Sequence, residues 1–327
     1  MNNIRVSHES PLALLDHSKH YNDFDYCLTH LLDEQPTYRE FFKKQCLDPA
    51  REVLFDASIF ELGYMAPGFP EHVAEFKPTS FIVPDVLDDM KGTIDSWKDF
   101  TSKYPDLPGR RIGVVQGKTF EESLECYEFM TAHADMIAIS FDCAMYSDPD
   151  FVKIPSEELQ SYGDEKQARW CFGRITFVDM LVSKSKWCLQ KPVHLLGCSL
   201  PREFQFYRDN RLSLPNIYSI DTSNPVTAGM NEVYYDPAIG LKFKPKTKLF
   251  ERVGEDISSD QLNAIIYNLE AFKEFIGRES DPIKRELIRR TNIKYAISAE
   301  LDFRSPAVRE AHIWTDDKGQ AWKDVPA

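Results

Sequence analysis

The chain has 327 residues, of which 43% are hydrophobic, and its formal net charge is −13. This length accommodates one large α/β barrel with elaborations, since such barrels need about 250 residues. The acidic balance disfavours non-specific binding to a polyanion. No apolar run approaches the roughly 20 residues of a membrane-spanning helix, and residues 1–10 lack the pattern of a signal peptide.

The cysteines give no sign of a disulfide framework or a zinc site. There are seven, an odd number, scattered along the chain, and none forms a CxxC pair. Secreted disulfide-bonded domains and cysteine zinc sites have regular, closely spaced cysteines instead. We therefore expect a protein of the reducing cytoplasm.

Short apolar runs separated by helical stretches predict parallel strands covered on both faces. A first strand is expected at 12–15, followed by helical pattern over 26–32 and 38–45. The eighth strand is expected within 233–241 or is displaced by the lysine-rich loop. This order predicts a (β/α)8 barrel of the TIM type, as one catalytic domain over 1–327. The strands between the first and the eighth are expected at 53–56, 81–85, 112–117, 136–142, 193–198 and 217–221.

Two segments are expected to elaborate the barrel. Residues 144–187 are too long for an ordinary barrel helix, so they predict an insertion at the catalytic face with a helix over 165–186. Residues 242–327 predict a basic loop and a C-terminal helical extension. Within it, a helix is expected over 258–276, capped by Ser259 and ended by Gly277.

Four expected strands end on residues of catalytic type: Asp56, Asp85, Gln116 and Asp221. Since the carboxyl ends of barrel strands build the active site, we expect these side chains to converge on one pocket of an enzyme. Asp56 and Asp221 could be the acid/base and nucleophile of glycosyl transfer. Asp85 and Gln116 suit the edge of a guanine-type base, because a carboxylate accepts from N–H groups and an amide donates to a carbonyl oxygen. A helix cap is the alternative for each acidic residue taken singly.

Cations cluster near the expected pocket despite the acidic balance. They are candidates for contacts with a phosphate backbone, which position a nucleic acid without reading its sequence. Solvated surface is the alternative reading. A histidine inside one expected strand, His194, is expected to be a packed strand residue and not a ligand. The candidate cations are Lys242, Lys244, Lys246 and Lys248 after the Asp221 strand, and Arg169 and Arg174 in the insertion.

The order of these strand ends resembles the tRNA-guanine transglycosylase superfamily. The resemblance covers about residues 50–230, as short motifs and not as continuous similarity. It implies a (β/α)8 barrel that exchanges guanine in a polynucleotide for a 7-deazaguanine base without a redox cofactor or a nucleoside triphosphate. The motifs are VLFDAS (53–58), VPDV (83–86), GVVQG (113–117), LLGCS (195–199) and SIDTSNP (219–225).

The resemblance also implies roles for single residues. Asp221 corresponds to the nucleophile and Asp56 to the residue that assists as acid/base, while Asp85 and Gln116 correspond to the residues that hold the purine edge.

Further positions are implied for the base-binding backbone. Gly117 would let the backbone approach the ligand, Ser140 or Phe141 would offer a backbone N–H to the base, and Gly197 belongs to the same set.

The chain departs from the family in ways that bear on its substrate. It lacks the three closely spaced cysteines of the family's zinc site, so no metal is expected, and the segment TSNPVTAGMN (222–231) replaces an arginine-rich one. These departures resemble the phage branch that inserts 7-deazaguanines into DNA and thereby protects the genome from restriction enzymes. The implied partners are DNA, with tRNA as the alternative, and a free base such as preQ0 or preQ1. A barrel glycosidase and a catalytically silent nucleic-acid-binding subunit are the rival interpretations.

Overall fold

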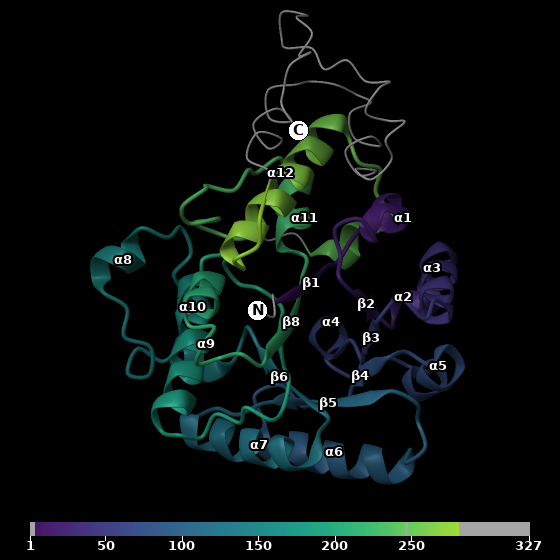
Figure 1. Ribbon diagram of the computed structural model, residues 1–327, viewed down its shortest axis with the longest axis horizontal. Coiled ribbons are helices and arrows are strands. Elements are labelled where there is room, and N and C mark those ends of the chain that lie inside the picture. The colour runs from purple at the N-terminus through teal and green to yellow at the C-terminus, as the bar shows by residue number, and fades with distance from the viewer. Residues whose placement is uncertain (1–3, 246–247, 281–327) are drawn as a thin grey trace, which may run out of the picture.

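The computed structural model describes residues 4–245 and 248–280. Eight parallel strands alternate with helices and form a nearly closed barrel, a (β/α)8 fold of the TIM type (Figure 1). The fold class predicted from the sequence is therefore confirmed. The strands are β1 (Arg5–His8), β2 (Asp25–Leu28), β3 (Val53–Asp56), β4 (Ser80–Ile82), β5 (Arg110–Val115), β6 (Met136–Ser140), β7 (Val193–Leu196) and β8 (Ile217–Thr222).

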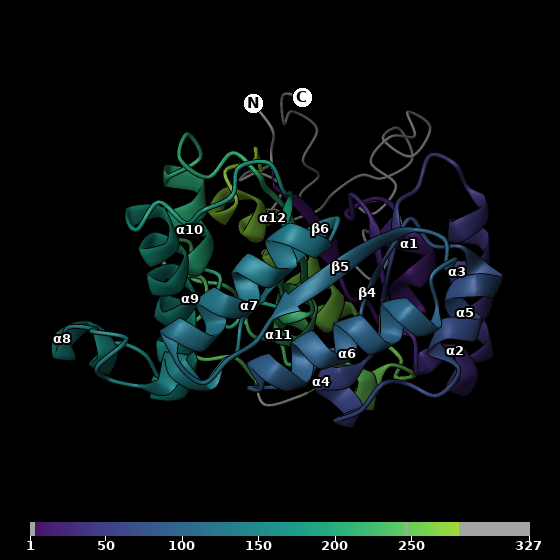
Figure 2. The same ribbon diagram turned by 90° about the horizontal axis from the view of Figure 1, so that it is seen from below.

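Helices cover the outside of the barrel, and none in the described part of the chain is long and apolar enough to cross a membrane. Helices α6 and α7 lie side by side along β5 (Figure 2). The helices are α1 (Leu15–Ser18), α2 (Leu31–Glu34), α3 (Pro36–Leu47), α4 (Ile59–Leu62), α5 (Phe69–Phe76), α6 (Met90–Lys103), α7 (Phe120–His133), α8 (Ser156–Gln160), α9 (Glu165–Ser183), α10 (Glu203–Asp209), α11 (Asn224–Met230) and α12 (Ser259–Phe275).

The sheet is continuous from β1 through β8 back to β2, and the ladder is interrupted only between β1 and β2 in the described residues. Side chains bridge this seam. The Val6 N–H donates to Asp23 Oδ2 at 2.8 Å, and the Tyr26 N–H donates to Ser7 Oγ at 3.1 Å. Buried backbone groups need such partners, so polar side chains close the barrel where the strands do not pair.

The prediction from the sequence was wrong for the positions of the first two strands and of the last. Residues 12–15, expected as a strand, form a 3-10 turn and the start of α1, and residues 25–28, largely expected as helix, form β2. The strand that ends on Asp221 is itself β8, so no strand is needed within 233–241. The physical reason is that β1 and β2 carry buried polar residues such as Ser7 and Asp25, which conceal the apolar signature of a barrel strand.

The expected elaborations have helices near the predicted places. Helix α9 begins after Asp164, whose side chain accepts from the Gln167 N–H at 3.1 Å. Helix α12 packs on α11 beside the barrel (Figure 1). Its cap is Ser258 and not Ser259, within a capping box, and Gly277 follows its end at φ +75°. Residues 246–247 and 281–327 of the predicted extension lie outside the described residues.

Candidate active site

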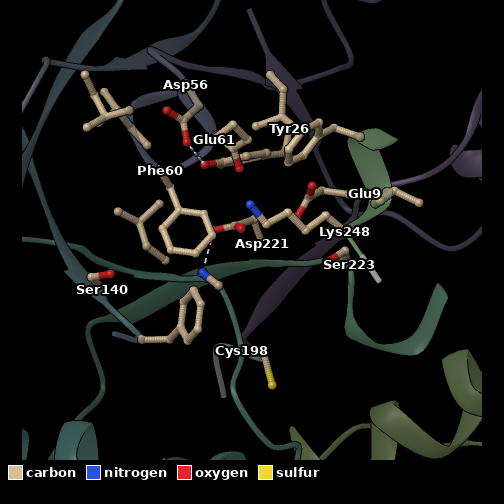
Figure 3. Close-up of a pocket in the computed structure, with 18 of the residues that line it drawn as sticks. Glu9, Tyr26, Asp56, Phe60, Glu61, Ser140, Cys198, Asp221, Ser223 and Lys248 are labelled. Atoms are coloured by element: carbon tan, nitrogen blue, oxygen red, sulfur yellow. Dashed lines mark hydrogen bonds between the residues drawn. The ribbon is translucent and has the colours of Figure 1, made fainter. Parts of the chain in front are cut away.

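A cavity of about 240 Å³ opens at the carboxyl ends of the strands. Every strand, or for β1 the residue that follows it, contributes to the wall, so the cavity occupies the position where barrel enzymes carry their active sites. Figure 3 shows Asp221 in the middle of this cavity, with Tyr26, Asp56 and Glu9 around it. Residues at or after the strand ends that line it are Glu9, Tyr26, Asp56, Asp85, Gln116, Ser140, Phe141, Gly197 and Asp221.

The Asp221 carboxylate is held by two N–H donors on one oxygen. Its Oδ1 accepts from His194 Nε2 at 2.9 Å and from the Gly197 N–H at 3.1 Å. Asp221 is 4% exposed, so these bonds replace most of the hydration that a carboxylate needs. Among the described residues, Oδ2 is the oxygen left for a ligand, which suits a nucleophile with a fixed orientation.

His194 is a packed strand residue, as predicted, but its hydrogen bond to Asp221 was not predicted. It is fully buried on β7, and its Nδ1 lies 2.8 Å from Ser219 Oγ on β8. With the Ser219 hydroxyl donating to Nδ1, Nε2 carries the proton that it donates to Asp221. The available signal was the alternation of polar residues in SIDT (219–222), which faces His194 across the ladder.

Asp56 lies in the same cavity but in a different environment. Its Oδ2 accepts from the Tyr26 hydroxyl and its Oδ1 from the Ser58 N–H at 2.7 Å. Burial raises the pKa of Asp56 to about 6, and the nearby Asp221 charge adds to this rise against the two hydrogen bonds. A carboxyl with such a pKa can exchange a proton near neutral pH, as a general acid or base must.

Asp85 and Gln116 form the predicted pair. Gln116 Nε2 donates to Asp85 Oδ2 at 2.7 Å, and Gln116 Oε1 accepts from the Asp88 N–H at 3.0 Å. The Gln116 side chain therefore has its carbonyl engaged and one amide N–H left for a ligand's oxygen. Burial raises the pKa of Asp85 to about 7. The pair gives one wall of the cavity a fixed polar edge beside largely apolar side chains.

Only some of the backbone positions expected to bind the base lie at the cavity. Ser140 and Gly197 line the cavity, as predicted. The Phe141 N–H donates to Leu196 O at 2.9 Å within the barrel, so it is not available to a base. Gly117 is not among the lining residues; a Cβ there would lie 2.6 Å from the Ser123 N, so its glycine serves packing against α7.

The structure corrects the role predicted for Arg174. Its side chain is fully buried and forms an ion pair with Glu203, at 2.5 Å from Nε to Oε1. Its remaining N–H groups donate to the carbonyls of Ile139, Leu196 and Gly197 at 2.8–3.0 Å. Arg174 therefore ties together the ends of β6 and β7 and is not accessible to nucleic acid.

The other predicted cations differ in access. Lys244 and Lys248 line the cavity, and Lys242 is exposed next to them. Arg169 is half-buried and pairs with Glu165 at 2.8 Å. Lys246 lies outside the described residues. Two lysines at the cavity mouth thus remain the clearest candidates of the predicted set for contacts with phosphate.

Two further carboxyls line the cavity that the sequence interpretation did not single out. Glu9 follows β1, and burial raises its pKa to about 8, with the Asp221 charge adding to the rise. Glu61 lies on α4, and burial raises its pKa well above the ordinary value, with Asp56 adding to it. Both pKa values are raised because several carboxyls lie close together in a buried site, where the charged form is disfavoured. Glu9 was missed because β1 was misplaced.

Comparisons with known proteins do not identify the chain: it matches no family model and no curated protein. In the residues that the structure describes, no group of three or more His, Cys, Asp or Glu side chains is arranged to hold a metal ion. The site must therefore be interpreted from its own geometry.

Proposed function

We propose that this protein is a base-exchange transglycosylase that replaces guanine in a polynucleotide, preferably DNA, with a 7-deazaguanine such as preQ0 or preQ1. The observation that carries the proposal is that the buried, oriented Asp221 carboxylate shares one cavity with the Asp85–Gln116 pair. A nucleophile suited to a sugar carbon and an edge suited to a purine are what base exchange needs.

In the first half-reaction Asp221 acts on the nucleotide. A guanine nucleotide enters the cavity flipped out of its stack, because C1′ is inaccessible within a duplex. Asp85 accepts from the N–H groups of the guanine edge, and the free Gln116 N–H donates to its carbonyl oxygen. Asp221 Oδ2 attacks C1′, the C1′–N9 bond breaks, and guanine leaves with the bonding pair and takes up the proton of the protonated Asp56 carboxyl, which is left ionised. The product is a glycosyl ester on Asp221.

The second half-reaction regenerates the carboxylate. A 7-deazaguanine enters the same cavity and meets the same Asp85–Gln116 edge. Asp56, whose pKa of about 6 leaves it mostly ionised at neutral pH, accepts the proton of the incoming N9–H. N9 then attacks C1′, the C1′–O bond to Asp221 breaks, and the new nucleotide is released. The two Asp221 states alternate in a ping-pong cycle.

Hydrolysis of a glycoside by the same two aspartates is the competing chemistry. The Asp85–Gln116 edge favours a base over a sugar, since two polar groups bonded to each other at 2.7 Å and fixed at Asp88 present one flat acceptor–donor pattern. Replacement of Gln116 by Ala is expected to weaken guanine binding selectively.

Isotope exchange tests the proposal. The purified protein is incubated with radiolabelled guanine and, in separate reactions, with guanine-containing DNA and with tRNA. We expect label in DNA. Label in tRNA alone would keep the mechanism and overturn the choice of DNA, and label in neither polymer would overturn the proposed activity.

A further inference from the structure

A row of aromatic side chains leads from the cavity to the insertion. The Phe141 ring at the end of β6 packs against Trp170 on α9 at 5.6 Å between centroids, with the ring planes at 88°. Both residues line the cavity and both are half-buried. Phe60, which also lines the cavity, has its ring centroid 5.5 Å from that of Phe141. The aromatic surface therefore continues from inside the cavity to its rim.

Two of these three rings have a lysine ammonium over them. Lys244 Nζ lies 5.2 Å from the Phe141 centroid, and Lys166 Nζ lies 4.5 Å from the Trp170 centroid. Lys166 is exposed, and among the described residues it makes no ion pair within 4 Å. We call Phe141, Trp170, Lys166 and Lys244 the aromatic–lysine strip. The net charge of the chain is −13, so these two lysines make a locally positive surface beside a cavity lined by carboxyls.

The two sides of the strip are fastened to each other. Gln167, between Lys166 and Trp170 on α9, accepts from the Lys244 N–H and donates to Lys244 O at 3.2 Å. Ser199, just after β7, donates to Gln167 O at 2.7 Å. Hydrogen bonds between side chains and the backbone thus hold the lysine segment, α9 and the barrel in one arrangement. A surface fixed in this way can bind a ligand without paying to order its own elements.

We propose that the aromatic–lysine strip binds the unpaired nucleotide next to the exchanged guanine, its base stacked on Trp170 and its phosphate at Lys166 and Lys244. The proposal rests on the proposed function and deepens it, because it assigns the substrate as a locally single-stranded polynucleotide. Aromatic platforms interleaved with cations are the usual surface for single strands, and a base within a duplex cannot offer its face to a side chain.

The Lys166 ammonium must move for this stacking to occur. It lies over the Trp170 ring, where an exposed cation–π contact is weaker than stacking of a nucleobase on the same ring. An incoming base therefore displaces the ammonium, which then lies beside the phosphate of the same nucleotide. Lys166 thus contacts the Trp170 ring in the free protein and the phosphate in the complex.

Fluorescence anisotropy tests the strip without requiring turnover. The probe is a fluorescein-labelled oligothymidylate with one central guanine, alone or in duplex. We expect Trp170→Ala to weaken single-strand binding about tenfold, since stacking of one base is worth that factor or more, and Trp170→Phe to restore most of it. Lys166→Gln is expected to lower the salt dependence of log K by about 0.7, the single-strand value for one phosphate.

Two variants serve as controls. Leu212→Ala removes an apolar side chain that is 95% exposed outside the cavity, and Lys43→Gln removes an exposed cation on α3. Both are expected to bind the probe like the wild type. Equal binding by Trp170→Ala and wild type, or tighter binding of the duplex than of the single strand, would overturn the proposal.

The same probes separate this inference from the proposed function. Single-strand binding that depends on Trp170, without guanine exchange, would leave the strip standing and remove the transglycosylase. Guanine exchange, together with single-strand binding that does not change in the Trp170 and Lys166 variants, would support the transglycosylase and overturn the role of the strip.

Discussion

At the scale of single residues, the two aspartates of the cavity have different partners. Asp221 accepts from two N–H groups on one oxygen, whereas Asp56 accepts from a hydroxyl and a backbone N–H on separate oxygens. The pKa of Asp56 is raised to about 6. Pairs of carboxyls whose environments differ in this way are typical of sites that need one nucleophile and one proton carrier.

Removing the His194 donor tests how Asp221 is held. His194→Phe keeps a flat ring next to Tyr26, which stacks on His194 at 6.2 Å, but deletes the Nε2–H. We expect kcat for guanine exchange to fall about 10–100-fold, since a buried carboxylate loses one partner worth about 1–3 kcal/mol. Guanine affinity should change little. His194→Gln, which can still donate, should retain more activity, and wild-type kcat in His194→Phe would refute the positioning role.

The raised pKa of Asp85 predicts a pH dependence of base binding. Below a pKa of about 7 the carboxyl is protonated and cannot accept both guanine N–H groups; above it the carboxylate can. The affinity for guanine should therefore decrease as the pH drops below 7, and well below 7 it should decrease by about tenfold per pH unit. Titration calorimetry at several pH values measures this.

Two variants isolate the Asp85 contribution to that profile. Asp85→Asn should bind weakly and lose the transition near pH 7. Gln116→Ala should bind weakly but keep a pH-dependent profile, because Asp85 remains. A wild-type profile without a transition near neutral pH would contradict the role of Asp85 as the acceptor of the base.

At the scale of elements, the end of β7 organises the site. Gly197 is at φ +64°, its N–H donates to Asp221, and its carbonyl accepts from Arg174 at 2.8 Å. A Cβ at this position would overlap the Phe141 ring. The turn after β7 thus links the buried Arg174, Asp221 and the aromatic–lysine strip.

A pair of glycine variants separates local strain from the effect on the site. Gly197→Ala should cost about 1–3 kcal/mol for the left-handed backbone and the clash, and should lower exchange strongly because the Asp221 donor shifts. Gly63→Ala is matched: φ is +78°, and nothing lies within 4 Å of the added Cβ. The Gly63→Ala variant should therefore lose stability but keep its exchange activity. Thermal unfolding and exchange rates measure both, and equal activity of the two variants would contradict the account.

The buried Arg174–Glu203 pair gives a prediction about stability. Arg174→Met leaves Glu203 buried without its cation, which should cost about 3–5 kcal/mol of unfolding free energy. The double change Arg174→Met with Glu203→Leu should recover much of that loss, because no uncompensated charge remains. Denaturant unfolding measures both. A double variant as unstable as the single one would show that the carbonyl bonds of Arg174, and not the ion pair, carry the effect.

At the scale of the whole molecule, the sequence predicted the barrel and the strand ends from β3 onward because these strands are apolar runs. It could not place β1 and β2, because the partners of their buried Ser7 and Asp25 are distant in the sequence: Tyr26 across the seam for Ser7, and Arg51 before β3 for Asp25. Consequently Glu9 and Tyr26 were missed. The convergence of Asp56, Asp85, Gln116 and Asp221 follows from strand polarity alone and was predicted.

What the sequence could not supply were the contacts that depend on register and side-chain direction. The His194–Asp221 hydrogen bond could be predicted only with the register of β7 against β8. The hydrogen bond from the Phe141 N–H to Leu196 O could be predicted only with the pairing of β6 and β7. Arg174 illustrates the same limit: its position in the insertion predicted an accessible cation, whereas Glu203 and three carbonyls hold it in the interior.

Comparison of the wild type with Asp221→Asn tests the central claim most directly. Incorporation of labelled guanine into DNA is measured together with calorimetric binding of guanine. The account predicts that the variant binds guanine within about a factor of a few of the wild type and loses at least about 10³-fold in exchange, as expected when a covalent nucleophile is removed. Persistent exchange by Asp221→Asn would contradict the account.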